Sequence, residues 1–123
     1  MATSEDLEHY IIQTDYPFES IASNMWVIHN TANIVVTYDP PLVLFRMKLM
    51  DIPKARREDF FRLLLELNAS QMIHGAYGIE EENVVLIDTL QSEQLDFNEF
   101  QASLEALLLA STQDYQKLNT FRI

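Results

Sequence analysis

The chain has 123 residues, 48% of them hydrophobic, and carries a formal net charge of −11. This length and apolar content suit one folded domain, so we expect residues 1–123 to form a single domain with an ordinary core. Because there is no cysteine, the composition excludes a disulfide, a thiol nucleophile and a Cys-based zinc site. No apolar run approaches the roughly 20 residues that cross a bilayer. The negative net charge argues against nucleic acid and anionic membranes as partners.

The first predicted element is a helix over residues 4–13. Thr3 or Ser4 can cap its start, acidic residues follow where the positive end of the helix dipole favours them, and apolar residues recur at helical spacing. Pro17 follows the end of this helix. Residues 18–22 have no clear pattern, and we interpret them as a linker or a poor strand.

Three strands are predicted next, over residues 24–29, 34–38 and 42–50. The alternation is clearest in the third, where apolar side chains at every second position are separated by Arg46 and Lys48. The connections are short, so we expect the three strands to form an antiparallel meander.

Residues 51–69 are predicted to form a central helix around which the other elements are arranged. Asp51 can cap it, Pro53 is tolerated in its first turn, and residues 54–67 contain no glycine and no β-branched residue. Apolar side chains span roughly 200° of its circumference, whereas packing on one sheet face needs an arc only somewhat wider than about 100°. The residues of this arc are Phe60, Phe61, Leu63, Leu64, Leu65 and Leu67. The excess is therefore buried either against a second element of the same chain or in another chain.

Two more strands, residues 71–79 and 84–90, are predicted to form a hairpin, and a final helix starts near Leu95. Asp96 can cap this helix, whose apolar residues recur every three, four or seven positions as far as Leu118. The order α-β-β-β-α-β-β-α predicts a two-layer α+β fold with a mainly antiparallel, five-stranded sheet.

Motifs that would indicate catalysis are sparse in this sequence. It has no Gly-rich phosphate loop and no serine in a nucleophile motif. His74 and Asp88 can face each other across the second hairpin, which leaves a small metal- or metabolite-binding domain or an enzyme as the alternative function. We favour a cross-strand polar pair, or a histidine whose ring is satisfied in the core, and we expect no catalytic residue, no metal and no cofactor.

Charged residues and methionines offer a weak indication of binding surfaces. Six of the eight basic residues fall within residues 46–62. We interpret them as salt-bridge partners of the acid-rich remainder, and a stripe that orients an acidic partner is the alternative. Methionines adapt to irregular partners, so Met25 and Met47, with Arg46 and Lys48, are candidate contacts for a partner.

The whole pattern resembles the type III secretion chaperone-like fold, and within it the YbjN-type bacterial proteins. The segments that carry the resemblance are WVIHNTANIVVTYD, LVLFRMKLMDIPKARREDFFRLLLELNA and HGAYGIEEENVVLIDTL followed by LDFNEFQASLEALL. The resemblance implies a small, acidic, cytoplasmic homodimer without catalytic residues, whose apolar patches bind a client protein. Carried over to this sequence, it makes Phe61, Leu64, Leu65, Asn68 and Met72 candidates for the dimer interface. We therefore expect a non-enzymatic, protein-binding, chaperone-like or regulatory dimer.

Overall fold

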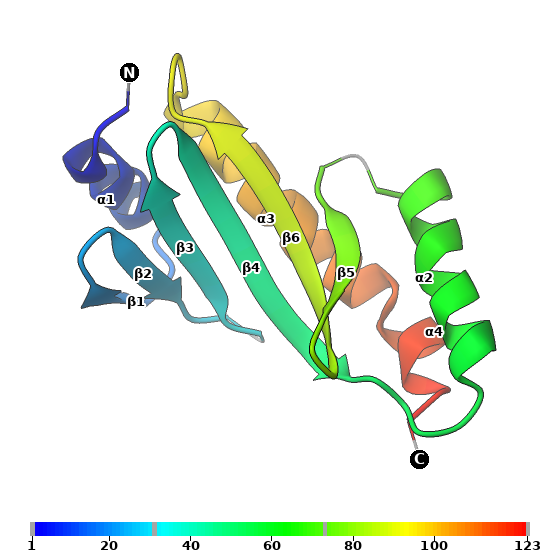
Figure 1. The fold of residues 1–123 in the computed structure, drawn as a ribbon. Coiled ribbons are helices and arrows are strands. Elements are labelled where there is room, and N and C mark those ends of the chain that lie inside the picture. Colours follow the sequence, from blue (N-terminus) through cyan, green and yellow to red (C-terminus); the bar gives the residue numbers. More distant parts are fainter. Residues whose placement is uncertain (1, 31, 73, 123) are drawn as a thin grey trace.

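An antiparallel sheet with helices packed on one face and at one end makes up the structure, which is a computed structural model (Figure 1). It describes residues 2–30, 32–72 and 74–122. In chain order the elements are α1 (Ser4–Gln13), β1 (Phe18–Ala22), β2 (Met25–Ile28), β3 (Ile34–Asp39), β4 (Leu42–Asp51), α2 (Arg57–Ser70), β5 (Ala76–Glu80), β6 (Asn83–Gln91), α3 (Phe97–Gln113) and α4 (Tyr115–Asn119).

The α+β class and the antiparallel sheet are confirmed, but the sheet has six strands rather than the five that the sequence predicts. The strands lie in the order β1-β2-β3-β4-β6-β5. The additional strand is β1, the segment that the sequence leaves as a linker or a poor strand. It is an edge strand paired only with β2, and most of its residues are exposed, so it needs no apolar alternation.

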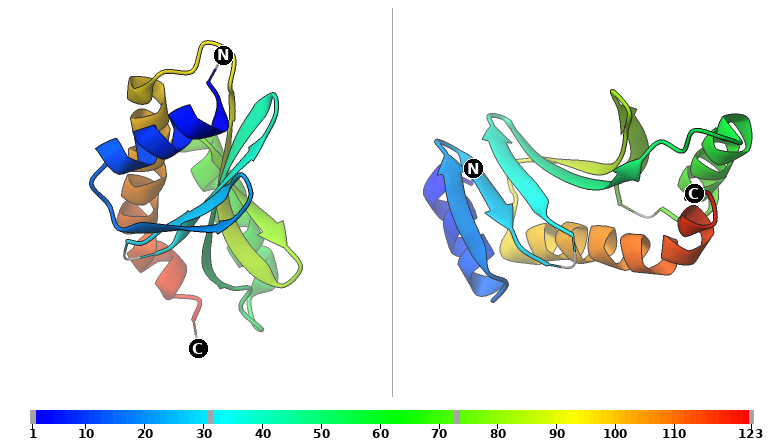
Figure 2. Two further views of the ribbon diagram at one scale, coloured as in Figure 1. Left: turned by 90° about the vertical axis from the view of Figure 1, so that its left-hand side faces the viewer. Right: turned by 90° about the horizontal axis from the view of Figure 1, so that it is seen from below.

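The core lies between the sheet and helices α1 and α3, which cover the same face (Figures 1 and 2). Phe45 of β4 packs edge-on against Phe100 of α3, with ring centroids 5.2 Å apart, and Tyr10 of α1 contacts the same Phe100 ring at 5.7 Å. Both phenylalanines are fully buried. Helix α2 lies beyond the edge strand β5, where Phe60 packs on Phe121 near the C-terminus.

Helix α1 begins and ends as predicted, and its start is a reciprocal cap. The Asp6 N–H donates to the Thr3 hydroxyl at 3.2 Å, and the Thr3 N–H donates to the Asp6 carboxylate at 2.9 Å. The hydrogen bond from the Thr3 N–H to the carboxylate is the largest cause that holds the pKa of the Asp6 carboxyl below its usual value.

Helix α2 begins six residues later than the predicted start at Asp51, because the chain there is still part of the sheet. Asp51 pairs with Asn83 of β6, and the Ile52 N–H donates to the Glu82 carbonyl at 2.8 Å. Arg56 then stands at the N-cap in the left-handed region, with φ 58° and no side-chain cap. Asp51 therefore does not cap α2 as expected, because its backbone is extended and pairs with β6.

Two other boundaries also differ from the prediction. Strand β5 starts at Ala76 rather than at residue 71, and residue 73 of the predicted strand lies outside the described residues. The closing helix is capped as expected, with the Asp96 side chain accepting from the Glu99 N–H, but it divides at Asp114 into α3 and α4. In the part of the chain that the structure describes, no helix has the length and apolar character to span a membrane.

Candidate partner-binding surfaces

Two polar contacts fix helix α2 beside the edge strand β5. At its first residue, the Arg57 guanidinium donates to the Glu82 carboxylate in the β5–β6 turn at 2.7 Å. Near its last turn, the Asn68 side chain binds the backbone of Tyr77. Because the helix start lies near the end of β5 and the helix end near its start, the two elements run antiparallel. The residues of α2 between these anchors therefore lie along β5.

Asn68 protects the free edge of β5 in the way that a neighbouring strand would. Its amide oxygen accepts from the Tyr77 N–H at 2.7 Å, and its amide nitrogen donates to the Tyr77 carbonyl at 3.1 Å. A sheet edge with unpaired backbone groups is open to pairing with another chain. Asn68 is predicted from the sequence as a dimer-interface candidate. In the structure its side chain forms these two hydrogen bonds within the chain.

Replacing Asn68 by alanine is expected to lower the free energy of unfolding by about 1 to 2 kcal/mol, since the two hydrogen bonds between its side chain and the Tyr77 backbone are lost. The Tyr77 amide should also exchange its hydrogen faster, which hydrogen–deuterium exchange measures. The exposed Asn98 of α3 provides the matched control. Equal exchange at Tyr77 in the Asn68→Ala and Asn98→Ala variants would show that Asn68 does not protect the edge.

The wide apolar arc of α2 is only partly covered within the chain. Phe60, Leu64 and Leu67 are buried, and Leu64 is 4% exposed. By contrast, Leu65 is 68% exposed, and Phe61 is half-buried. Most of the predicted excess is thus absorbed by the core, and Leu65 remains outside it.

Leu65 belongs to a small apolar surface at the α2 side of the sheet. Phe61 lies one helical turn before it, and Ile79 of β5, which is 47% exposed, lies along the same stretch between the two polar anchors. Met72, just after the helix, is half-buried. We call Phe61, Leu65, Met72 and Ile79 the α2 patch. Ile79 is not among the interface residues predicted from the sequence, because it precedes three glutamates, which are typical of a solvated turn.

The second surface is the face of the sheet opposite α1 and α3, which these helices leave uncovered (Figure 2). Directly paired residues share a face, and the pairing places Val27, Val35, Arg46 and Ile87 in one row across four strands. We call this surface the open face; its residues are Met25, Val27, Val35, Leu44, Arg46, Lys48 and Ile87. The sequence indicates that β6 is apolar on both faces, because residues 84–87 are apolar at every position. This pattern predicts the apolar residues that β6 contributes to the open face.

Only some of the residues predicted from the sequence to contact a partner lie on the open face. Met25 is half-buried there, in the row of Leu44. Met47 is fully buried on the other side of β4, so it is part of the core. Arg46 and Lys48 are exposed on the open face, where Arg46 pairs with Glu80 at 3.0 Å and Lys48 with Asp51 at 3.3 Å.

The interpretation of the basic cluster as salt-bridge partners is supported by the structure. Besides the two open-face pairs, Arg56 lies 4.0 Å from Asp59, and Arg57 and Arg62 each contact a glutamate. All five pairs are solvent-exposed, so each stabilises the fold by only about 0 to 1 kcal/mol. Lys54 is the one member of this cluster for which no acidic partner is found among the described residues.

The structure does not gather ligands around His74 and Asp88. His74 is exposed. One Asp88 carboxylate oxygen accepts from the Thr89 N–H at 2.8 Å, and the other is buried without a hydrogen-bond partner. Within the described ranges, no group of three or more His, Cys, Asp or Glu side chains could hold a metal ion.

Comparison with known proteins gives this fold a family. The family model CesT_Tir_1, which describes a type III chaperone family, matches residues 1–122. No curated protein matches the sequence.

Solved structures share the fold at low sequence identity. A chain of the ExsC–ExsE complex is 16% identical with a TM-score of 0.73, covering 96% of this chain and 97% of that chain. YbjN from E. coli is 12% identical with a TM-score of 0.71, covering 94% and 93%. A chain of the ExoU–SpcU complex from the type III secretion system of Pseudomonas aeruginosa is 14% identical with a TM-score of 0.69, covering 94% and 97%. Since the family model spans nearly the whole sequence, the chain belongs to the CesT_Tir_1 family of type III chaperones, and it has the type III secretion chaperone-like fold.

Proposed function

We propose that the chain is a non-enzymatic, chaperone-like protein that forms a homodimer and binds a partner polypeptide through apolar surface. Membership of a chaperone family supports the general part of this proposal. Several structures with this fold are complexes with a partner protein, among them ExsC–ExsE, ExoU–SpcU and the chaperone–effector complex HopA1–SchA. The dimer and the location of the partner surface are proposals about this chain.

The exposure of Leu65 is the observation that carries the dimer proposal. A leucine that is 68% exposed between two polar anchors leaves apolar area in water beside Phe61 and Ile79. Burying apolar area in an interface contributes roughly 25 cal/mol per Å², from which the cost of association is subtracted. We assign the α2 patch to the contact between two copies of the chain, because a closed dimer pairs the same patch on both subunits.

The open face is the surface that we assign to the partner polypeptide. Four of its apolar residues, one from each of four strands, are half-buried and Val27 is buried. It also carries two cations, Arg46 and Lys48. An acidic group on a partner can compete for these cations because their present ion pairs are exposed. The two surfaces lie on different sides of the sheet, so dimer formation through the α2 patch leaves the open face accessible.

The Leu65→Asp variant is expected to convert the dimer into a folded monomer. A carboxylate in the contact would be desolvated without a partner, whereas in the single chain this position is exposed and the fold should tolerate the charge. Sedimentation velocity measures the mass, and circular dichroism verifies the fold. Leu109→Asp, at an exposed leucine of α3 on another surface, is the matched control and should leave the dimer intact. A Leu65→Asp variant that sediments as the wild-type dimer would contradict the assignment of the α2 patch.

A further inference from the structure

Three basic side chains for which no ion pair is found among the described residues belong to segments at one end of the fold. Five of the eight basic residues form ion pairs with acids of the same chain. For Lys54, Lys117 and Arg122, no ion pair is found in the described part of the chain. Lys54 precedes α2, Lys117 is in α4, and Arg122 follows α4. Helices α2 and α4 are adjacent (Figure 1), so the segments that carry these three cations lie at one end of the molecule.

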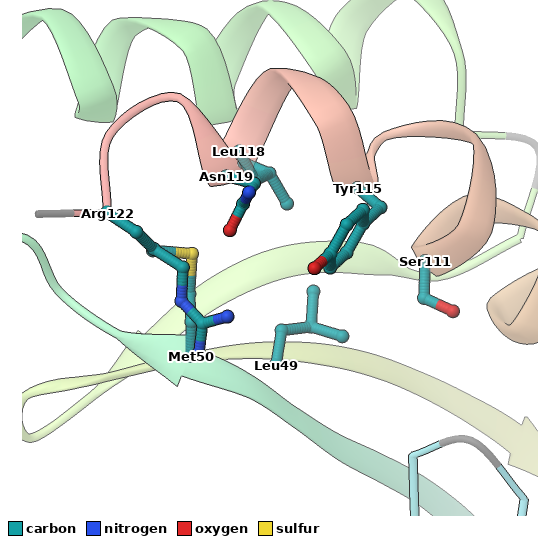
Figure 3. A pocket seen from close by; sticks show the side chains of 7 residues that line it. All are labelled: Leu49, Met50, Ser111, Tyr115, Leu118, Asn119 and Arg122. Carbon is teal, nitrogen blue, oxygen red and sulfur yellow. The ribbon is translucent and has the colours of Figure 1, made fainter.

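Two adjoining cavities lie at this end. The first, which we call the apolar slot, has a volume of about 50 Å³ between β4 and helices α3 and α4. Figure 3 shows Leu49 and Met50 on the β4 side, with Tyr115, Leu118 and Asn119 projecting towards them from α4. Tyr115 is 56% exposed, so the slot is reached from the surface. A volume of this size is several times that of one water probe, and it suits a small alkyl side chain such as that of valine.

The second cavity, which we call the basic dish, is wider and carries the free charges. It has a volume of about 450 Å³ and is lined by residues 50–54 together with Arg122. Lys54 and Arg122 both line it. Its one carboxylate, Asp51, already accepts from Lys48 at 3.3 Å. The dish is therefore positive within a chain of net charge −11. Met50 and Arg122 line both cavities, so the slot and the dish are continuous.

We propose that the apolar slot and the basic dish together bind a short acidic segment of a partner protein. A small alkyl side chain of the segment enters the slot, and a neighbouring carboxylate lies between Lys54 and Arg122. Charge complementarity selects this occupant, because two cations, for which the described residues provide no ion pair, flank an apolar cavity. A second copy of the chain bound face to face would bring the same positive charges together, which disfavours it. The lining residues of the slot and the dish belong to neither the α2 patch nor the open face, although the dish adjoins the open face through the ion pair between Asp51 and Lys48. The inference therefore goes beyond the proposed function and does not depend on it.

The test uses the full chain labelled with ¹⁵N and three synthetic pentapeptides as probes. The peptides are Ac-DDVDD-NH₂, the uncharged Ac-NNVNN-NH₂ and the acidic Ac-DDGDD-NH₂, which lacks the alkyl side chain. We expect the first peptide to shift the amide signals of Leu49, Lys54, Tyr115 and Arg122 and to bind more tightly than the other two. The Lys54→Glu/Arg122→Glu variant should weaken this binding roughly tenfold, since exposed charge pairs are individually weak and two are reversed.

A matched control separates this site from general charge attraction. The Arg62→Glu/Gln13→Glu/Asn98→Asp variant changes the net charge by the same amount at three exposed residues that line neither cavity and do not belong to the open face. We expect it to bind the first peptide as the wild-type chain does. Equal loss of binding in the test variant and the control variant, equal binding of all three peptides, shifts confined to the open face, or no shifts at millimolar peptide would each overturn the proposal. Because the readout is local, its failure is distinguishable from a failure to dimerise.

Discussion

The Gly75→Ala variant is expected to lose about 3 kcal/mol or more of its free energy of unfolding, since backbone strain and a steric clash add at this position. Gly75 has φ +77°, which a residue with a side chain rarely adopts, and a Cβ atom there would lie 2.4 Å from the Ile87 carbonyl oxygen. It would also lie 2.9 Å from the Leu107 side chain. A backbone oxygen held in the β5–β6 ladder cannot move aside without disturbing the sheet.

The second glycine of the chain supplies the control. At Gly78 an added Cβ atom would meet its nearest neighbour at 3.7 Å, which is ordinary contact. Gly78→Ala should therefore change the free energy of unfolding by no more than about 1 kcal/mol, and it can even stabilise the chain by restricting the unfolded state. Urea unfolding of the two variants measures the difference. Equal stabilities would show that the close approach at Gly75 is not a feature of the folded protein.

The Tyr77→Phe variant is expected to lose about 2 to 3 kcal/mol of its free energy of unfolding. The Tyr77 hydroxyl donates to the Asp114 carboxylate, and both residues are buried, Asp114 at 2% exposed. Without this donor, a buried carboxylate loses its charge-assisted hydrogen bond. Urea unfolding is again the measurement. Tyr115→Phe, at an exposed tyrosine, is the matched control and should change the stability by no more than about 0.5 kcal/mol.

The same hydrogen bond predicts a dependence of stability on alkaline pH. Burial, followed by the hydrogen bond to Asp114 and its negative charge, raises the pKa of Tyr77 above its ordinary value of 10.0. Below pH 10 this phenol is protonated in both the folded and the unfolded chain, so its contribution is fully present. Above pH 10 only the unfolded chain loses the proton, so the free energy of unfolding falls as the pH rises. This fall should be smaller in Tyr77→Phe, and an identical fall in the wild-type chain and the variant would contradict the role of Tyr77.

Tertiary contacts explain where the predictions from sequence succeed and fail. Helix α1 is predicted to the residue because its signals, the Thr3 cap and the apolar spacing, lie within the helix itself. Asp114, where the closing helix divides, accepts a hydrogen bond from Tyr77, 37 residues away, and no local pattern reveals this contact. Strand β1 is missed because an edge strand gains its backbone partners from β2 and not from the burial of alternate side chains.

The sequence predicts that apolar surface is exposed on α2, but only some of the residues predicted for the candidate surfaces are exposed. The width of the α2 arc indicates exposed apolar surface, and Leu65 fulfils this expectation, whereas Leu64 faces the core. Met47 is predicted as a partner contact because it is a methionine near a strand end, although the alternation with Arg46 and Lys48 already places it on the core side. The role of Asn68 at the edge of β5 requires knowledge that β5 is an edge strand, which only the strand order provides.

The mass of the wild-type chain in solution tests most directly whether a second copy covers the α2 patch. Light scattering coupled to size-exclusion chromatography, over a concentration series from about 1 to 100 μM, spans the affinities at which the chain can act as a dimer. We predict twice the chain mass of 14.3 kDa at the upper concentrations. A mass of 14.3 kDa across the whole series would contradict the account, because Leu65 and its neighbours would then remain exposed to water.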